Sequence, residues 1–241
     1  MLTSSHNAVG ATLALQIQGV DGESTPVSVQ VREAYNFGYA ARDRAGAQEH
    51  VDQMRALGLP APQQVPAIFP IPADRVSTAP EFVVSGEQTY GEVEFALIKS
   101  EGHGWLVTIA SDHTDLEVER VKMPKAKGMC PDVVGADVWK LDDVHAQWDR
   151  CTLTMWARTD GGEAVQLQHD TAGHLLAPHD IIAILEDRRP GELPPGTVIM
   201  SGTVAGEPTP GMHSWSARLE DPQTGRRLEI DYTLRRLREE I

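Results

Sequence analysis

Cysteine and basic residues are both scarce in this sequence. Cys130 and Cys151 are the only two cysteines among 241 residues, too few for a disulfide scaffold or a four-thiolate zinc site, and we expect both to be reduced packing residues. Lys and Arg number 21 against 35 Asp and Glu, which gives a formal net charge of −14. Because such a surface repels phosphate backbones and anionic lipids, the charge argues against nucleic acid and acidic membranes as partners.

Long hydrophobic runs are also missing. No apolar stretch approaches the roughly 20 residues that a membrane span needs, and the first 20 residues lack the basic start of a signal peptide. We therefore expect a cytoplasmic protein. The hydrophobic share of 41% is ordinary for a globular chain and too high for disorder. The length favours one large domain, or one domain with a small attachment.

The first third of the chain predicts a small N-terminal subdomain. Alternating apolar residues over 11–31 are typical of a β-hairpin, and helical spacing of apolar residues predicts a helix over 41–58. Six prolines then fall between residues 60 and 80, which excludes a helix and favours an ordered, extended connector. We place the boundary so that residues 1–72 form the subdomain and residues 73–241 form the main domain.

Beyond the connector the patterns are mostly those of strands. They predict strands over 81–85, 91–99, 105–111, 151–159, 164–168, 197–200, 214–220 and 228–234, and one helix over 178–185. The regular alternation of strands and helices that marks a doubly wound sheet is missing. The expected fold class is therefore α+β and rich in β structure.

The segment Tyr90–Ile98 places two carboxylates on one face of a strand. Glu92 and Glu94 project to the same side because side chains alternate with period 2, and the apolar second half of the strand must be covered. If the next strand pairs through a four-residue turn, Asp112 lies opposite Glu92 within one residue of register. The three carboxylates then meet at one end of a hairpin.

Three carboxylates this close repel each other or have raised pKa values unless a cation compensates them. A site with oxygen ligands alone suits Mg²⁺ or Mn²⁺, with Ca²⁺ as a third choice, rather than zinc. The alternative is that Glu92 and Glu94 mark the solvent face of an edge strand. From the residues alone both interpretations stay open.

Several motifs, in order, resemble the fumarylacetoacetate hydrolase superfamily. They are the Glu92–Glu94 strand, the strand end Ser111–Thr114, a lysine before Cys130 and Pro131, and the late run Pro195–Gly206. Within that run, Gly202–Gly206 is similar to the family's Gly-Thr-Pro-x-Gly loop, with Val204 in place of the proline. The resemblance is closest to a bacterial branch catalogued as a domain of unknown function, and it implies a mixed β roll.

The resemblance also implies roles for single residues. The family's metal ligands match Glu92, Glu94 and Asp112, and its lysine matches Lys127, with Lys125 as a second choice that contacts the substrate. Substrate binding is implied for Gln168, Gly202 and Thr203. The implied partners are a small carboxylic acid and a second copy of the chain in a homodimer.

One departure from the family concerns the catalytic base. The histidine that the family carries in an early lid segment corresponds to Ala40, although Asp43 falls where its acidic partner is expected. His113 and His50 are possible substitutes, each with a structural role as the alternative. The family's arginine a few residues after the metal aspartate corresponds to Leu116.

These features together predict a divalent-metal-dependent hydrolase that cleaves a carbon–carbon bond in a small 2-oxo or 1,3-dicarbonyl acid. The first alternative is a decarboxylase, isomerase or hydratase that acts on a similar acid. The second is a binding module that kept the fold and lost turnover. A fold alone does not choose among these activities.

Overall fold

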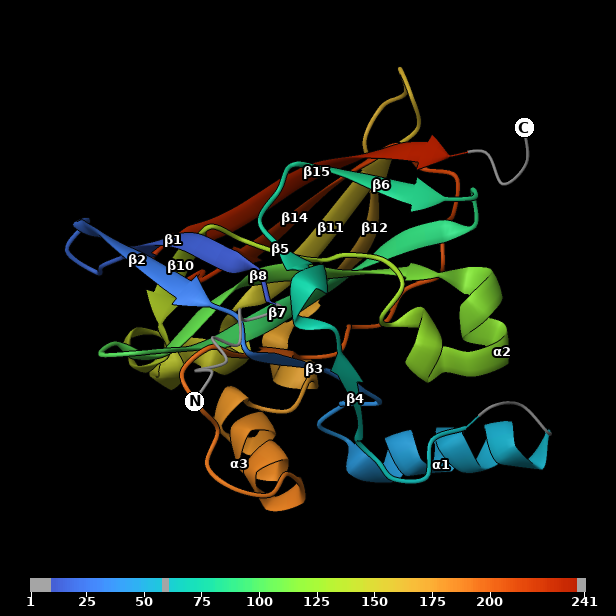
Figure 1. The fold of residues 1–241 in the computed structure, drawn as a ribbon, viewed down its shortest axis with the longest axis horizontal. Coiled ribbons are helices and arrows are strands. Elements are labelled where there is room, and N and C mark those ends of the chain that lie inside the picture. Colours follow the sequence, from blue (N-terminus) through green and yellow to red (C-terminus); the bar gives the residue numbers. More distant parts are fainter. Residues whose placement is uncertain (1–9, 58–60, 238–241) are drawn as a thin grey trace, which may run out of the picture.

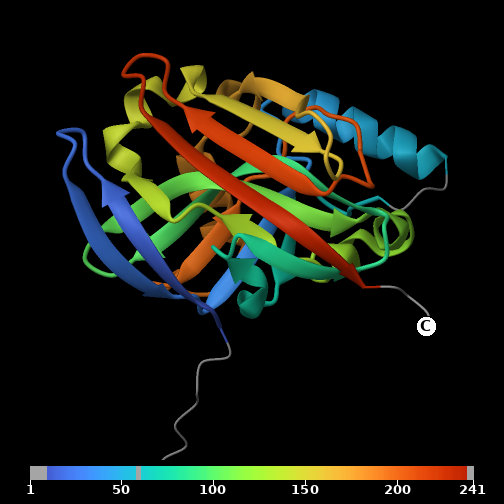
Figure 2. The same ribbon diagram turned by 90° about the horizontal axis from the view of Figure 1, so that it is seen from above.

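Two β-sheets, one of ten strands and one of five, form the body of the protein (Figures 1 and 2). The computed structural model describes residues 10–57 and 61–237. One core cluster joins the two sheets, and a second is formed within the larger sheet, where residues of the N-terminal hairpin pack against its other strands. The expected class, a strand-rich α+β fold, is confirmed.

The larger sheet mixes parallel and antiparallel pairs. Its strand order is β2-β1-β10-β8-β7-β13-β3-β4. Outside this order, β9 pairs with both β8 and β5. The strands are β1 (Thr12–Gln18), β2 (Ser24–Gln30), β3 (Glu33–Gly38), β4 (Ala67–Ile71), β5 (Val76–Ser77), β7 (Thr89–Ser100), β8 (Gly104–Asp115), β9 (Asp132–Val134), β10 (Asp137–Lys140) and β13 (Thr197–Met200).

The smaller sheet has the order β12-β11-β14-β15-β6. Its strands are β6 (Glu81–Ser85), β11 (Thr152–Arg158), β12 (Val165–Thr171), β14 (Ser214–Glu220) and β15 (Arg227–Leu237). It covers the face of β7 and β8 that carries Val93 and Phe95, both fully buried. The apolar cover that the sequence required for this strand is therefore present.

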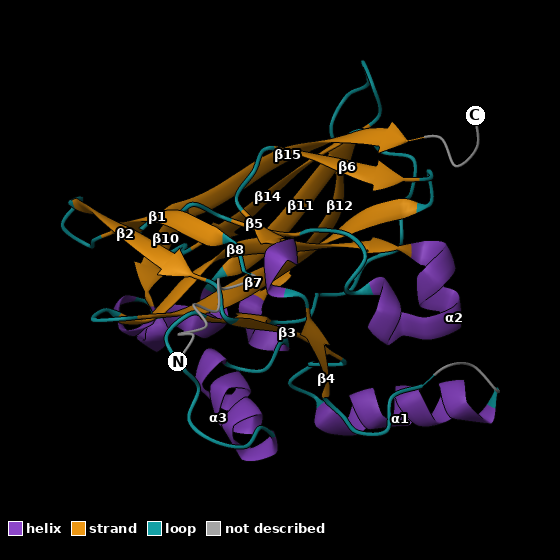
Figure 3. Ribbon diagram, in the orientation of Figure 1, coloured by secondary structure: helices purple, strands orange, loops and turns teal. Residues whose placement is uncertain are grey.

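Within the described residues, three α-helices lie outside the sheets (Figure 3). They are α1 (Arg44–Ala56), α2 (Leu116–Ala126) and α3 (Pro178–Arg188), and short 3₁₀ helices span Ala73–Arg75, Leu141–Asp143, His145–Arg150 and Ala172–His174. Asp43 caps α1 by accepting a hydrogen bond from the Gly46 amide. The helix predicted over 41–58 therefore begins later than expected, and its predicted end at Gly58 lies outside the described residues.

The connector rich in proline contributes an edge strand. β4 pairs only with β3 in the sheet order, and Pro70 lies within it. An edge position tolerates this proline because no further strand needs its missing N–H. Since β13 bonds to both β3 and β7, strands from either side of the predicted boundary at residue 72 share one sheet. The division into two domains stays a prediction.

The β7–β8 hairpin is the longest pairing in the fold and sets the position of the acidic residues. Its antiparallel register places Glu92 directly opposite Asp112, as the sequence predicts. The β8–β9 register then places Asp112 opposite Asp132. Partners in an antiparallel register point to the same face, so Glu92, Asp112 and Asp132 form a row across three strands.

No helix in the described part of the chain is long and apolar enough to cross a membrane.

Candidate metal centre

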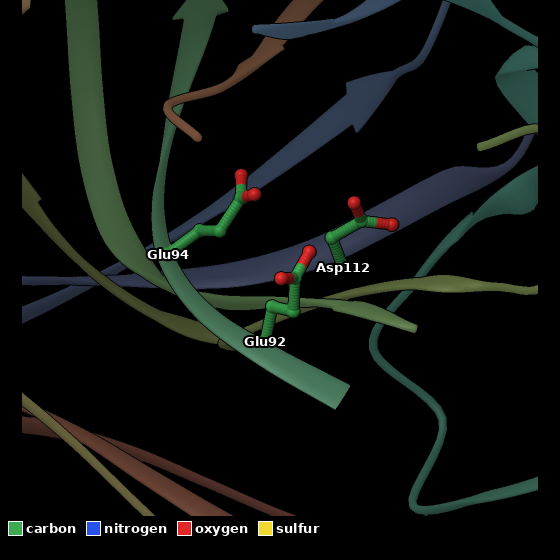
Figure 4. Close-up of side chains that lie close together, drawn as sticks. All are labelled: Glu92, Glu94 and Asp112. Atoms are coloured by element: carbon green, nitrogen blue, oxygen red, sulfur yellow. The ribbon is translucent and has the colours of Figure 1, made fainter. Parts of the chain in front are cut away.

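Glu92, Glu94 and Asp112 converge on one point. Each offers a carboxylate oxygen, and these three oxygens lie within 4.8 Å of one another. Figure 4 shows the two glutamates rising from β7 toward the aspartate of β8. Glu94 and Asp112 are buried, whereas the Glu92 side chain keeps 20% of its surface exposed. The cluster is thus closed on one side and open at Glu92.

Burial dominates the electrostatics of the glutamates. It raises the pKa of Glu92 to about 7, with Lys127 opposing the shift and Asp112 adding to it. Burial also raises the pKa of Glu94 well above its usual range, and the neighbouring Asp112 adds to that shift. Both glutamates therefore hold protons more tightly than exposed carboxylates do, and a bound cation would release those protons.

Lys127 supplies the positive charge in the cluster. Its Nζ donates hydrogen bonds to Asp112 Oδ2 and, at 3.2 Å, to Glu92 Oε2. Burial alone would lower the pKa of this lysine, but Asp112, Glu92 and Glu119 outweigh burial and raise the pKa well above its usual value. The side chain is therefore an ammonium ion among the carboxylates.

A break in α2 brings Lys127 back to the strands. Pro124 lies inside the helix, and Lys122 leaves the helical conformation with φ −156° and ψ 82°. Proline disfavours a continuous helix because it lacks the N–H and clashes with the preceding turn. The chain therefore turns at this point, and the residue after the helix reaches β7 and β8.

The donor set fits a hard divalent cation. All three groups are carboxylates, which is the chemistry that Mg²⁺ and Mn²⁺ prefer. Asp112 Oδ1 is buried, and no partner for it lies among the described residues. A buried oxygen without a partner is costly, and a cation between Asp112 and the two glutamates would satisfy it.

The loop after β13 and the second sheet fix the backbone of β7. The Gly202 amide donates to Glu94 Oε2 at 3.0 Å, and its φ of +81° with a Cβ position 2.7 Å from Phe37 O favours glycine there. Gln168 accepts from the Val93 amide at 2.8 Å and donates to Thr203 Oγ1 at 2.9 Å. Of the predicted substrate-binding residues, Gly202 therefore contacts a carboxylate of the cluster, whereas Gln168 and Thr203 bond to the backbone of Val93 between the two glutamates.

Three other predicted site residues lie elsewhere. His113 is on the opposite face of β8, where Nδ1 lies 3.1 Å from the Tyr232 hydroxyl. Asp43 is exposed and caps α1. Lys125 is exposed on α2, and Ala40, at the position of the family's histidine, is buried. The structure therefore brings the triad and Lys127 together without these candidate proton carriers.

Sequence reasoning missed a further carboxylate, Glu119 on α2. Its Oε1 lies 3.7 Å from Lys127 Nζ, and its Oε2 accepts a 2.8 Å hydrogen bond from the Tyr90 hydroxyl. Tyr39 lies close by, since Glu119 and Glu92 both contribute, after burial, to raising the pKa of its phenol. Tyr90 could have been found, because it alternates with Glu92 and Glu94 along the same strand.

Asp132 is a second missed carboxylate. It is fully buried on β9, and burial raises its pKa well above the usual value, with Asp112 adding to the shift. Asn36 on β3 is buried too, and its amide lowers the pKa of Asp132. Only the pairing of β9 with β8 reveals this neighbourhood, and a three-residue strand gives no sequence signal of its own.

Comparison with solved structures defines the class of fold. The chain resembles 2-keto-3-deoxyarabinonate dehydratase in a hexagonal crystal form (TM-score 0.62, 15% identity, 91% of this chain and 86% of that one). The apo form of the 2-keto-3-deoxy-D-arabinonate dehydratase gives TM-score 0.62 at 16% identity, with coverage of 91% and 86%. The form complexed with magnesium and 2,5-dioxopentanoate gives 0.61 at 16%, with coverage of 92% and 79%. These likenesses support a fold like that of fumarylacetoacetate hydrolase.

The particular family follows from the sequence. The family model described as "Protein of unknown function (DUF2848)" matches residues 37–232, and the chain belongs to this family. No curated protein matches the sequence.

Proposed function

We propose that this protein is a divalent-metal-dependent enzyme that acts on a small 2-oxo carboxylic acid, with elimination of water as the reaction. The observation that carries the proposal is the meeting of three carboxylates within 4.8 Å beside a buried lysine. Mg²⁺ or Mn²⁺ held by Glu92, Glu94 and Asp112 would polarise the carbonyl of a chelating oxo acid. The fold's resemblance to a dehydratase whose structure contains magnesium and 2,5-dioxopentanoate supports the same class.

Within this proposal Lys127 has two roles. Its ammonium holds Asp112 and Glu92 in place through hydrogen bonds, and it offers positive charge to the carboxylate or the developing oxyanion of the substrate. Gly202 and Gln168 have positioning roles. The Gly202 amide holds the Glu94 carboxylate, and the Gln168 side chain holds the backbone amide of Val93. The substrate enters on the side of Glu92, where the cluster is open.

The groups that can move protons support elimination over hydrolysis. Hydrolysis of a carbon–carbon bond needs an activated water, and in this chain Ala40 replaces the family's histidine while His113 turns to the other face of β8. Elimination needs a base at the carbon next to the carbonyl and a cation at the carbonyl oxygen. The cation site and Lys127 supply the positive charge at the carbonyl oxygen, and elimination needs no activated water.

A substrate panel tests the proposal. Purified protein with Mg²⁺ is incubated with 3-deoxy-2-oxo sugar acids, oxaloacetate and an acylpyruvate, and the products are followed by proton NMR. We expect loss of water from at least one 3-deoxy-2-oxo acid, and no reaction after chelation or in Glu94→Gln, whose amide oxygen still accepts from Gly202. Glu220→Gln, an ion-pair residue of β14, is the matched control.

Other outcomes of the panel point to the rivals. Cleavage of the acylpyruvate alone would support the predicted carbon–carbon hydrolase in place of elimination. Saturable binding of the acids with no product from any of them would support a binding module. A homodimer stays a prediction from the resemblance, and sedimentation of the same preparation tests it.

A further inference from the structure

The triad and Lys127 leave the proposed reaction without a group that moves a proton at carbon. Such a group must lie beside the cation site, face the open side, and have a free oxygen or nitrogen. The three carboxylates are unsuited to this task because a cation would occupy their oxygens. The group must therefore be a neighbour of Lys127.

Glu119 meets these requirements. Its Oε1 is 3.7 Å from Lys127 Nζ, beyond hydrogen-bonding distance, and in the described part of the chain no donor forms a hydrogen bond to it. Its side chain is 16% exposed, against 7% for Lys127 and none for Asp112. Glu119 thus lies at the open rim of the cluster with one oxygen available.

The second oxygen of Glu119 is held in place. Tyr90 is buried and donates its hydroxyl to Oε2 at 2.8 Å. Since Tyr90 and Glu92 lie on the same face of β7, this bond fixes Glu119 relative to the triad. The start of α2 is fixed as well, because Asp115 caps it by accepting from the Val118 amide at 2.9 Å. A base that is oriented by a partner and has a free oxygen is suited to proton transfer.

The other candidates lack this position. His113 Nδ1 is within 3.1 Å of the Tyr232 hydroxyl on the far face of β8. Asp43 caps α1. His50 lies on α1, exposed, with its ring centroid 6.2 Å from that of Tyr39. Among these four groups, only Glu119 contacts Lys127.

We propose that Glu119 removes and returns the proton during elimination of water from a 2-oxo acid with hydrogen at C3 and hydroxyl at C4. Oε1 takes a C3 proton, the C–H electron pair forms the C2=C3 bond, and the carbonyl pair moves to the C2 oxygen, whose charge faces Lys127. The C2 carbonyl then reforms, the C2=C3 pair shifts to C3=C4, and the C4–O bond breaks. The leaving hydroxyl takes the proton from Glu119, and water is the only co-product.

This inference rests on the proposed function, and deuterium exchange tests it without the true substrate. 2-Oxobutanoate has C3 hydrogens and no leaving group, so the first half of the reaction alone replaces them with deuterium in D₂O. We expect exchange that depends on Mg²⁺ and is followed by proton NMR. Glu119→Gln should slow it by about 100-fold or more, while Mn²⁺ and oxalate affinities in calorimetry stay within about threefold.

Two further variants sharpen the test. Glu117→Gln makes the same change on an exposed position of the same helix and should exchange at the wild-type rate. Tyr90→Phe removes the orienting hydroxyl and should slow exchange about tenfold without loss of Mn²⁺ binding.

Results that would overturn the role of Glu119 differ from those that would overturn the proposed function. Wild-type exchange in Glu119→Gln, or loss of exchange together with Mn²⁺ binding, would overturn the assignment, and so would exchange lost in His50→Gln alone. If the wild-type protein binds Mn²⁺ and oxalate but exchanges no deuterium, the proposed function itself fails and the inference falls with it.

Discussion

Asp112 and His113 are neighbours in sequence, yet they lie on opposite faces of β8 and meet different surroundings. Asp112 faces Glu92, Glu94 and Lys127. His113 faces the smaller sheet, where its ring centroid is 4.9 Å from that of Trp215 and its Nδ1 is 3.1 Å from the Tyr232 hydroxyl. One strand therefore has an acidic face and an aromatic face.

The two faces handle buried polar groups differently. On the aromatic face, Ser111 Oγ and His113 Nδ1 both lie within hydrogen-bonding distance of the Tyr232 hydroxyl. Among the described residues His113 Nε2 has no partner, but this atom belongs to a neutral ring. On the acidic face, three carboxylates share one ammonium, and Asp112 Oδ1 is left without a described partner. The faces therefore differ in charge: an excess of buried carboxylates makes the acidic face the one where a cation gains the most from binding.

The largest difference between the faces should appear in metal binding. Asp112→Asn removes one ligand charge and the closest acceptor of Lys127, so we expect Mn²⁺ affinity to fall by about 100-fold or more in calorimetry. Asp221→Asn is the control, because Asp221 is also buried but is bonded to Thr224 and Gln147. Equal losses in both variants would show that the effect is general destabilisation.

The second-largest difference between the faces should appear in how the free energy of unfolding depends on pH. Burial raises the pKa of Glu92 from 4.5 to about 7, so between these values the folded protein binds more protons than the unfolded chain. The free energy of unfolding of the metal-free protein should then fall by roughly 1–2 kcal/mol from pH 5 to 8, since part of the side chain is exposed. Glu94 and Asp132, whose pKa values are also raised, add to the decline, so Glu92→Gln should make it shallower by this amount. A decline unchanged in that variant would contradict the assignment.

The aromatic face should give the opposite slope. Burial lowers the pKa of His113 from 6.5 to about 3, so the unfolded chain binds more protons in this window. Stability from this residue is present above about pH 6.5 and is lost on acidification toward pH 3. Urea unfolding at several pH values measures both slopes. His113→Leu should remove only the loss of stability on acidification, which comes from the aromatic face.

The smallest effect is expected when His113 is replaced, because this residue should matter for stability and not for metal binding or exchange. His113→Leu loses a polar contact with Tyr232 and an edge contact with Trp215, which should cost about 1–2 kcal/mol of stability at neutral pH. Mn²⁺ affinity and deuterium exchange should stay at wild-type values. Loss of exchange in the folded variant would return His113 to the list of catalytic candidates.

Local patterns were enough to predict the register of the acidic face. Alternation in Tyr90–Ile98 and a short turn fix the register that places Glu92 opposite Asp112. The same reasoning predicted the terminal strands and α3, because long periodic segments carry their own signal. The α+β class followed from these elements.

The features that the sequence did not predict depend on contacts between distant segments. β9 is three residues long, and Asp132 joins the row only through pairing with Asp112. The position of Glu119 depends on a helix with weak periodicity that Pro124 interrupts. The role of His113 could not be predicted either, because the face it occupies is defined by the smaller sheet.

Titration of the metal-free protein with Mn²⁺, in the absence and presence of oxalate, measures whether Glu92, Glu94 and Asp112 hold a metal ion. We expect about one tight Mn²⁺ per chain, bound more tightly with oxalate, with binding lost in Glu94→Gln and retained in Glu220→Gln. Mn²⁺ bound equally well by Glu94→Gln, or not bound by the wild-type protein at all, would contradict this assignment.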